Sequence, residues 1–192
     1  YSEPYIALHG GAGLNDELEL DGDGGHFNAS LNVGSYAAVA AGSTISRYSR
    51  YADGRLELEL AWRSSELDEM DFLEGSEAAT GDLQALSLMV NSIAEYRMNR
   101  VFLPYVGIGA GWSLVEFSQA TVAGYPVIDA DDSAFSYQLL AGVVARLTNN
   151  LNLDVGYRYL RTLDLTFNDL YGRNFEMPYS CHTVAVGLRL DF

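Results

Sequence analysis

The sequence contains no lysine, four prolines and a single cysteine, Cys181, among its 192 residues. One cysteine excludes an internal disulfide and a cysteine-based zinc site. The eleven basic residues are all arginine and are outnumbered by 26 acidic ones. Their scatter argues against nucleic acid as a partner, because phosphate binding needs clustered cations. No apolar run approaches the roughly 18 residues of a membrane helix. The start of the chain does not resemble a secretion signal, so we expect any export signal to have been removed.

What the sequence does have is an alternation of apolar and polar residues with period two, which is typical of strands with one apolar face. The clearest case is segment 55–64. One of its faces carries Leu56, Leu58, Leu60 and Trp62, and the other carries Glu57, Glu59, Ala61 and Arg63. A helix would scatter these leucines around its circumference. The pattern therefore predicts an all-β chain.

Eight segments show this alternation or are consistent with it. They are 5–14, the 27–51 region, 55–64, 86–96, 105–114, 135–146, 151–159 and 182–192. The 27–51 region is poorly polarised and longer than a membrane strand of about 9–11 residues. We interpret it as one extended strand, with room for a bulge, rather than as two strands.

The connections between these segments alternate in length. Those after the second, fourth and sixth strands are short, whereas those after the first, third, fifth and seventh are long, at about 15–26, 67–82, 118–133 and 166–180. The segments 15–26 and 66–82 carry acidic residues and no basic ones: Asp16, Glu17, Glu19, Asp21, Asp23, Glu66, Asp68, Glu69, Asp71, Glu74, Glu77 and Asp82. Short turns at one rim and long loops at the other are typical of bacterial outer-membrane barrels.

The polar face of the predicted strands favours a membrane barrel over a soluble one. It carries four carboxylates and four guanidinium groups: Glu57, Glu59, Arg63, Glu95, Arg146, Asp154, Arg158 and Arg189. Inside a narrow barrel these groups could pair and fill the lumen. On a soluble barrel they would form an ordinary solvated surface, but such a surface normally also carries lysine. We place Gly107, Gly109 and Gly111 inward, where they would make room for Tyr105 or for arginine side chains.

The sequence resembles the small OmpA-like and opacity-type outer-membrane β-barrel family. The segments PYVGIGAGW, DGRLELELAWR, LNLDVGYRYL and VAVGLRLDF look like its fifth, third, seventh and last strands, and the resemblance covers essentially the whole chain. It implies a single barrel domain over 1–192, in the bacterial outer membrane, with periplasmic termini and extracellular loops. It also implies that the carboxy-terminal pattern Val186, Leu188, Leu190 and Phe192 is the recognition signal for outer-membrane assembly. The fold predicted is an antiparallel, up-and-down transmembrane β-barrel of eight strands.

Catalytic signals are weak. The only imidazoles are His9, His26 and His182, and no hydrolase motif surrounds His182. His26 could hold a metal with Asp21 or Asp23, but DGDGG lacks the remaining calcium ligands, and a solvated acidic loop is the alternative that we favour. We therefore expect no enzyme activity, no cofactor and no metal site.

The expected function is that of a monomeric structural or adhesion protein of the cell surface. Its partners would be outer-membrane lipid, lipopolysaccharide contacted directly or through divalent cations, or a host or matrix component at the loops. A narrow pore and an outer-membrane lipid hydrolase remain as alternatives.

Overall fold

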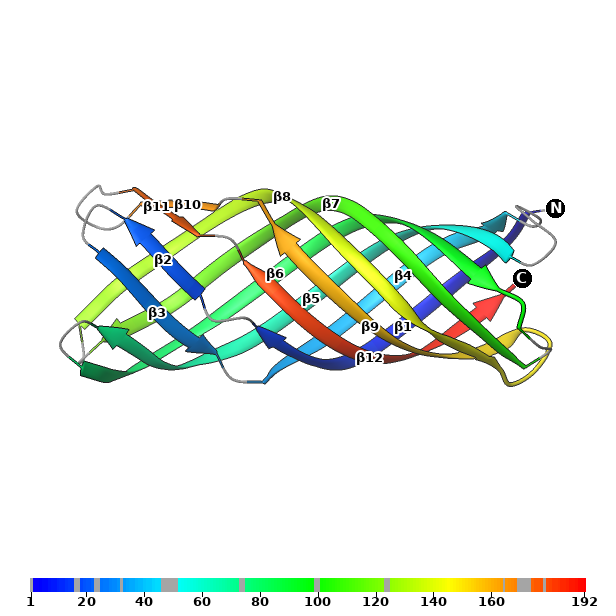
Figure 1. The fold of residues 1–192 in the computed structure, drawn as a ribbon, viewed down its shortest axis with the longest axis horizontal. Helices are drawn as coiled ribbons and strands as arrows, with labels where there is room; N and C mark the ends of the chain where they lie inside the picture. Colours follow the sequence, from blue (N-terminus) through cyan, green and yellow to red (C-terminus); the bar gives the residue numbers. More distant parts are fainter. Residues whose placement is uncertain are drawn as a thin grey trace.

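The chain forms one closed β-barrel in a computed structural model (Figure 1). The structure describes residues 2–15, 18–22, 25–31, 33–45, 52–72, 75–98, 101–122, 125–163, 165–168, 174–177 and 179–192. The eight strands of the barrel are β1 (Ser2–Asn15), β4 (Gly34–Ile45), β5 (Ala52–Phe72), β6 (Gly75–Tyr96), β7 (Phe102–Val122), β8 (Tyr125–Arg146), β9 (Leu151–Thr162) and β12 (Ser180–Asp191). Among these residues, none belongs to a helix long and apolar enough to cross a membrane.

The barrel closes where the first strand meets the last. β1 pairs with β12 in antiparallel register from Tyr5 opposite Asp191 to Asn15 opposite Cys181. The remaining pairs run β1–β4, β4–β5, β5–β6, β6–β7, β7–β8, β8–β9 and β9–β12, all antiparallel. Each strand thus has two neighbours, so the backbone hydrogen bonds of the sheet are satisfied without an open edge, as hydrocarbon requires. The predicted fold class is confirmed.

The two ends of the barrel differ. Figure 1 places both chain termini at one end, which we call the termini end. At the other, which we call the hairpin end, β5–β6 and β7–β8 run on to Phe72–Gly75 and Val122–Tyr125. Four short strands continue the sheet there: β2 (Leu18–Gly22), β3 (Gly25–Leu31), β10 (Leu165–Asn168) and β11 (Asn174–Met177). β3 pairs with β5 and β2, and β11 pairs with β2 and β10.

The connections predicted to be long, at 15–26, 67–82, 118–133 and 166–180, contain paired strands that extend the sheet at the hairpin end. One expectation about local structure was wrong. The 27–51 region is not one strand but two. Both strands pair with β5 on one side. On the other side β3 pairs with β2 and β4 pairs with β1, so the pairing partner changes between Leu31 and Gly34.

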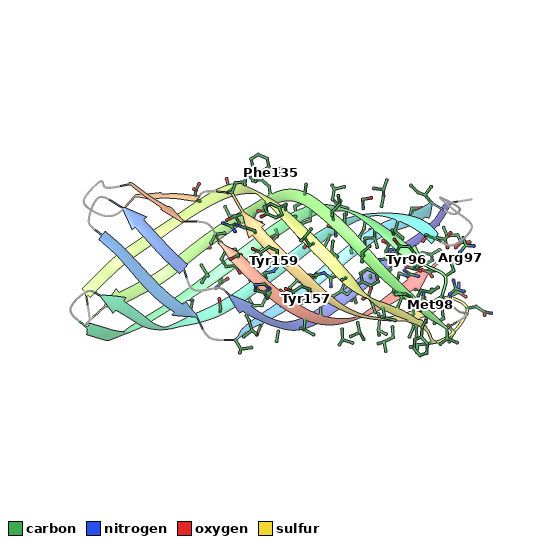
Figure 2. The ribbon with its side chains drawn as sticks, viewed as in Figure 1. Tyr96, Arg97, Met98, Phe135, Tyr157 and Tyr159 are labelled. Atoms are coloured by element: carbon green, nitrogen blue, oxygen red, sulfur yellow. The ribbon has the colours of Figure 1, made fainter. Side chains whose placement is uncertain are left out.

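The apolar face of the barrel points outward and the charged face points inward. Leu58 and Leu188 are 51% and 50% exposed, whereas Glu57 and Arg189 are each 4% exposed. Tyr96 and Met98 lie toward the termini end of the barrel, and Tyr157, Tyr159 and Phe135 lie toward the hairpins (Figure 2). An apolar band between aromatic residues at both edges is the arrangement expected for a lipid-facing surface.

Candidate functional site

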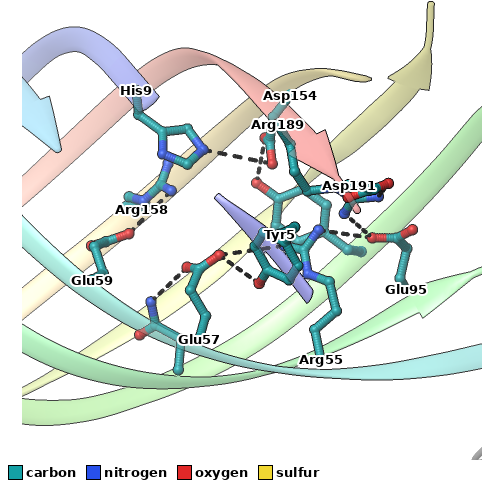
Figure 3. A network of polar contacts seen from close by, with 12 residues as sticks. Tyr5, His9, Arg55, Glu57, Glu59, Glu95, Asp154, Arg158, Arg189 and Asp191 are labelled. Atoms are coloured by element: carbon teal, nitrogen blue, oxygen red, sulfur yellow. Dashed lines mark hydrogen bonds and ion pairs between the residues drawn. The ribbon is translucent and has the colours of Figure 1, made fainter. Parts of the chain in front are cut away.

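The interior of the barrel is a network of charged and polar side chains (Figure 3). Its middle is built around Glu59 of β5, which is fully buried. Arg158 of β9 donates from Nη2 to Glu59 Oε2 at 3.2 Å, and Gln138 of β8 donates from Nε2 to Glu59 Oε1 at 3.2 Å. These contacts join strands that are not neighbours, so the network crosses the lumen rather than following its wall.

The same network continues toward β6 and β1. The Gln138 amide also donates to Asn91 Oδ1 at 2.7 Å, and Asn91 Nδ2 donates to Glu57 Oε1 at 3.0 Å. The other oxygen of Glu57 accepts from the Tyr5 hydroxyl at 2.9 Å. A continuous chain of hydrogen bonds therefore runs from Arg158 to Tyr5, and such chains hold their members in fixed orientations.

The lumen near the termini end is crossed by arginine–carboxylate pairs. Arg55 Nη1 and Arg189 Nη1 both donate to Glu95 Oε2, at 2.8 and 2.9 Å. Arg189 also pairs with Asp191, with 3.0 Å between Nε and Oδ1. The guanidinium carbons of Arg55 and Arg189 each lie 5.3 Å from the centroid of the Tyr5 ring, within the range of a cation–π contact. Two cations thus share one carboxylate and one aromatic ring.

The Tyr105 ring of β7 fills the space over Gly142 on the neighbouring strand β8 and over Gly156 on β9. Tyr105 donates from its hydroxyl to Asp154 Oδ1 at 2.9 Å, and Asp154 lies 3.8 Å from Nε2 of His9. A Cβ at Gly142 would lie 2.6 Å from the Tyr105 ring and equally close to the Val155 carbonyl oxygen. Gly107, Gly109 and Gly111 lie on the inward face as predicted, but they do not make room for Tyr105 or arginine: a Cβ at Gly109, for example, would meet Asn91 and Gln138.

The glycine at position 142 gives a first testable prediction. Gly142→Ala is expected to lower the free energy of unfolding by about 1–3 kcal/mol, because the added methyl group overpacks against Tyr105 and backbone. Gly54→Ala is the matched control, since its Cβ would meet only the Ile45 carbonyl oxygen at 3.8 Å. Urea unfolding in lipid vesicles measures both; equal stability of the two variants would contradict the packing described here.

The interior toward the hairpin end is polar but less charged. Arg63 Nη1 lies 3.4 Å from the Ser87 hydroxyl, which is 2.8 Å from Ser113 Oγ, and Ser136 donates to Ser113 at 2.7 Å. The Arg63 guanidinium stacks 5.0 Å from the centroid of Tyr36. Side chains thus occupy the lumen from the Arg189 level to the Arg63 level.

All but one of the predicted interior residues lie in the lumen. Glu57, Glu59, Arg63, Glu95, Asp154, Arg158 and Arg189 are all buried inside the barrel. Arg146 was placed wrongly in this set: it is exposed at the last position of β8. Arg146 occupies an inward position in the alternation, but it lies beyond the end of the lumen at the termini end, so its long side chain reaches solvent.

The site also contains polar residues that were not predicted, because the prediction considered only charged side chains. Asn91 and Gln138 lie on the predicted polar faces, and Tyr5 and His9 share the inward face of β1. Counting alternate positions through β1 would have identified the last two.

The predicted assembly-signal residues and acidic residues lie elsewhere. Val186, Leu188, Leu190 and Phe192 are exposed on the outside of the barrel. Of the acidic set, Asp82 is exposed on β6, and Glu19, Asp21, Glu66, Asp68, Glu69, Asp71 and Glu77 lie in strands whose backbone alone is described. Asp16, Glu17, Asp23 and Glu74 lie outside the described residues.

The described residues show no cluster of metal-ligating side chains. Within them, no three His, Cys, Asp or Glu side chains gather as a metal site would require. Cys181 is buried near the Thr183 hydroxyl, at 3.6 Å. His182 faces outward, where its ring lies 4.8 Å from that of Tyr159 and its Nδ1 is hydrogen-bonded to the Tyr157 hydroxyl.

Comparison with known proteins agrees with this architecture. Neisserial surface protein A and the outer membrane protein OprG from Pseudomonas aeruginosa each superpose with a TM-score of 0.57. Their sequence identities are 16% and 15%; the alignments cover 97% of both chains for the first, and 98% of this chain and 96% of the other for the second. At such identities the likeness concerns the fold alone.

Sequence relatives cover a smaller part. An uncharacterized protein of Brucella abortus is 28% identical to this chain over an alignment that covers 54% of this chain. The same alignment covers 46% of the relative, so the chain spans about half of that relative's length. The family model described as "Outer membrane protein beta-barrel domain" matches residues 2–192. Taken with the outward apolar band and the charged lumen, this match shows that the chain belongs to the outer-membrane β-barrel family of bacteria.

Proposed function

We propose that this protein is a non-enzymatic, non-conducting anchor that displays an acidic surface outside the cell. The observation that carries the proposal is the filled lumen, in which Glu59, Arg158 and Gln138 bond across the barrel from β5, β9 and β8. A closed wall with such a plug has no evident route for solutes, so its useful surface is the part that extends beyond the membrane. In this orientation the hairpin end is extracellular and both termini are periplasmic.

The charge distribution supports a role for the hairpin end. The segments 15–26 and 66–82 contain twelve acidic residues and no basic one, whereas the lumen nearly balances its own charges. Carboxylates at this density attract hard divalent cations, which can in turn bridge to lipopolysaccharide phosphates. The same surface could bind a cationic host or matrix component. We propose these as the partners of the protein.

Neutralising the acidic hairpins tests this role. The variant Glu66→Gln, Asp68→Asn, Glu69→Gln and Asp71→Asn is expected to weaken calcium binding severalfold in isothermal titration, with a parallel loss of binding to lipopolysaccharide in the presence of calcium. Replacing Glu3 by Gln at the termini end is the control. Unchanged binding by the quadruple variant would contradict the proposed role of the hairpins in binding cations and lipopolysaccharide. It would not affect the description of the barrel.

Conductance separates the anchor from the narrow pore. Planar-bilayer recordings of the purified protein are expected to show no sizeable steady current, because the paired side chains of the lumen block the path of a hydrated ion. A large ohmic current would contradict the proposal and favour the pore.

Enzyme activity is the remaining alternative. A hydrolase needs a nucleophile beside a base that a third group orients, whereas His182 lies on the outer face beside the rings of Tyr157 and Tyr159. If any lipid hydrolysis is detected, its persistence in the variant with His9, His26 and His182 replaced by Ala would exclude imidazole chemistry.

A further inference from the structure

The outer face of β9 changes character along its length. Its outward positions read Val155, Tyr157, Tyr159 and then Arg161. This order, apolar to aromatic to cationic, follows the passage from hydrocarbon through the interface to the lipid headgroups. β9 begins at Leu151 beside the termini end, and about 9–11 residues of strand cross a bilayer. Arg161, the eleventh residue of β9, therefore lies at the opposite interface.

The neighbours of Arg161 lie at the same level of the barrel. In the strand register Arg161 lies opposite Tyr137 on β8 and Ser180 on β12. Tyr159 lies on the same face, and its ring contacts His182, which bonds Tyr157. β9 ends at Thr162 and β12 begins at Ser180, so the full eight-strand wall of the membrane barrel ends here.

Among the described arginines, Arg161 and Arg146 are both exposed without an ion pair, but only Arg161 lies toward the hairpin end. Arg55, Arg63, Arg158 and Arg189 are buried in the lumen, and Arg97 is paired with Asp53 at the termini end. Arg161 is exposed, and no side chain that the structure describes lies within ion-pair distance of it. An exposed guanidinium at headgroup depth presents its fork of donors to whatever anion lies there.

We propose that Arg161, flanked by Tyr137 and Tyr159, binds the phosphate of a lipid headgroup in the leaflet at the hairpin end. A guanidinium matches two phosphate oxygens through parallel hydrogen bonds. The tyrosine rings and His182 provide the amphipathic surface on which the sugar or glycerol part of such a lipid would rest. The inference rests on the membrane embedding of the barrel. The proposed orientation of the barrel is used only to identify this leaflet as the outer one.

Tryptophan quenching by brominated lipids tests the site. The chain has two tryptophans; in a Trp62→Phe background the reporter is Trp112, whose ring lies 5.7 Å from Phe135 on the neighbouring β8. In phosphatidylcholine vesicles, brominated phosphatidic acid is expected to bind near Trp112 about fivefold more tightly than brominated phosphatidylcholine. Arg161→Ala should reduce this ratio to about one, while Arg161→Lys should keep only part of it, because an ammonium retains the charge but loses the paired hydrogen bonds of the guanidinium.

Arg146 provides a matched control, since it is also exposed but lies near the termini end. Arg146→Ala should keep the lipid preference of the parent, and unheated gel electrophoresis checks that every variant is folded. Equal binding of the two lipids by the parent would overturn the proposal, as would an unchanged ratio in Arg161→Ala. Neither result bears on conductance or on calcium binding, so failure here is distinguishable from failure of the proposed function.

Discussion

Glu59→Gln is expected to lower the free energy of unfolding by about 3–5 kcal/mol, as breaking one partner of a buried ion pair does. The carboxylate of Glu59 is the acceptor for both Arg158 and Gln138. The amide that replaces it keeps the shape but carries no charge, so Arg158 stays buried with its charge uncompensated. Reversible urea unfolding in lipid vesicles, followed by tryptophan fluorescence, measures the loss.

An exposed ion pair of the same kind gives the comparison. Arg97 binds Asp53 through two hydrogen bonds at the termini end, one of them 2.6 Å between Nε and Oδ2. The Arg97 side chain is 39% exposed, and exposed pairs contribute about 0–1 kcal/mol. Asp53→Asn should therefore cost far less than Glu59→Gln. Equal losses in the two variants would show that water reaches Glu59, contrary to the plugged lumen.

Leu58→Arg has the second largest expected effect. Leu58 lies on the outer face of β5 between Ala41 and Val90 on the neighbouring strands. It is well inside the apolar band, where an arginine on the lipid face costs about 2–4 kcal/mol. The loss should appear as a lower urea midpoint in vesicles. The energetic cause is desolvation of the guanidinium, so the effect should depend on depth.

Asp82→Arg is the control for Leu58→Arg. Asp82 is exposed on β6, beyond the apolar band toward the hairpins. A surface substitution of this kind changes stability by about 0.5 kcal/mol or less. If Leu58→Arg proved no more costly than Asp82→Arg, the outer face of β5 would not be in contact with hydrocarbon.

The alternation of side chains predicted which face points into the lumen for the strands whose two faces differ clearly, such as β5 and β12. Leu58 and Glu57 are one residue apart, and the period of two puts them on opposite sides of the sheet. Which arginine pairs with which carboxylate could not be predicted. That choice depends on the stagger between strands that are distant in sequence, such as β5 and β9, and the stagger is set only when the barrel closes.

The errors of the sequence prediction have local causes. The break between β3 and β4 follows from a change of partner, from β2 to β1, which no residue pattern within 27–51 records. The extension of the β5–β6 hairpin was missed because acidic residues stand at both odd and even positions of 66–82, which hides the alternation. Arg146 was misplaced because alternation gives a side but not a depth, and the lumen ends before the strand does.

Spin labels on β12 test most directly whether the apolar face meets lipid. In a Cys181→Ala background, nitroxides placed singly at Val184, Val186 and Leu188 should be readily relaxed by oxygen and protected from a water-soluble nickel chelate in vesicles. A label at Asp82 should show the reverse. Chelate access at the three β12 positions equal to that at Asp82 would contradict the account, because it would place this face in water.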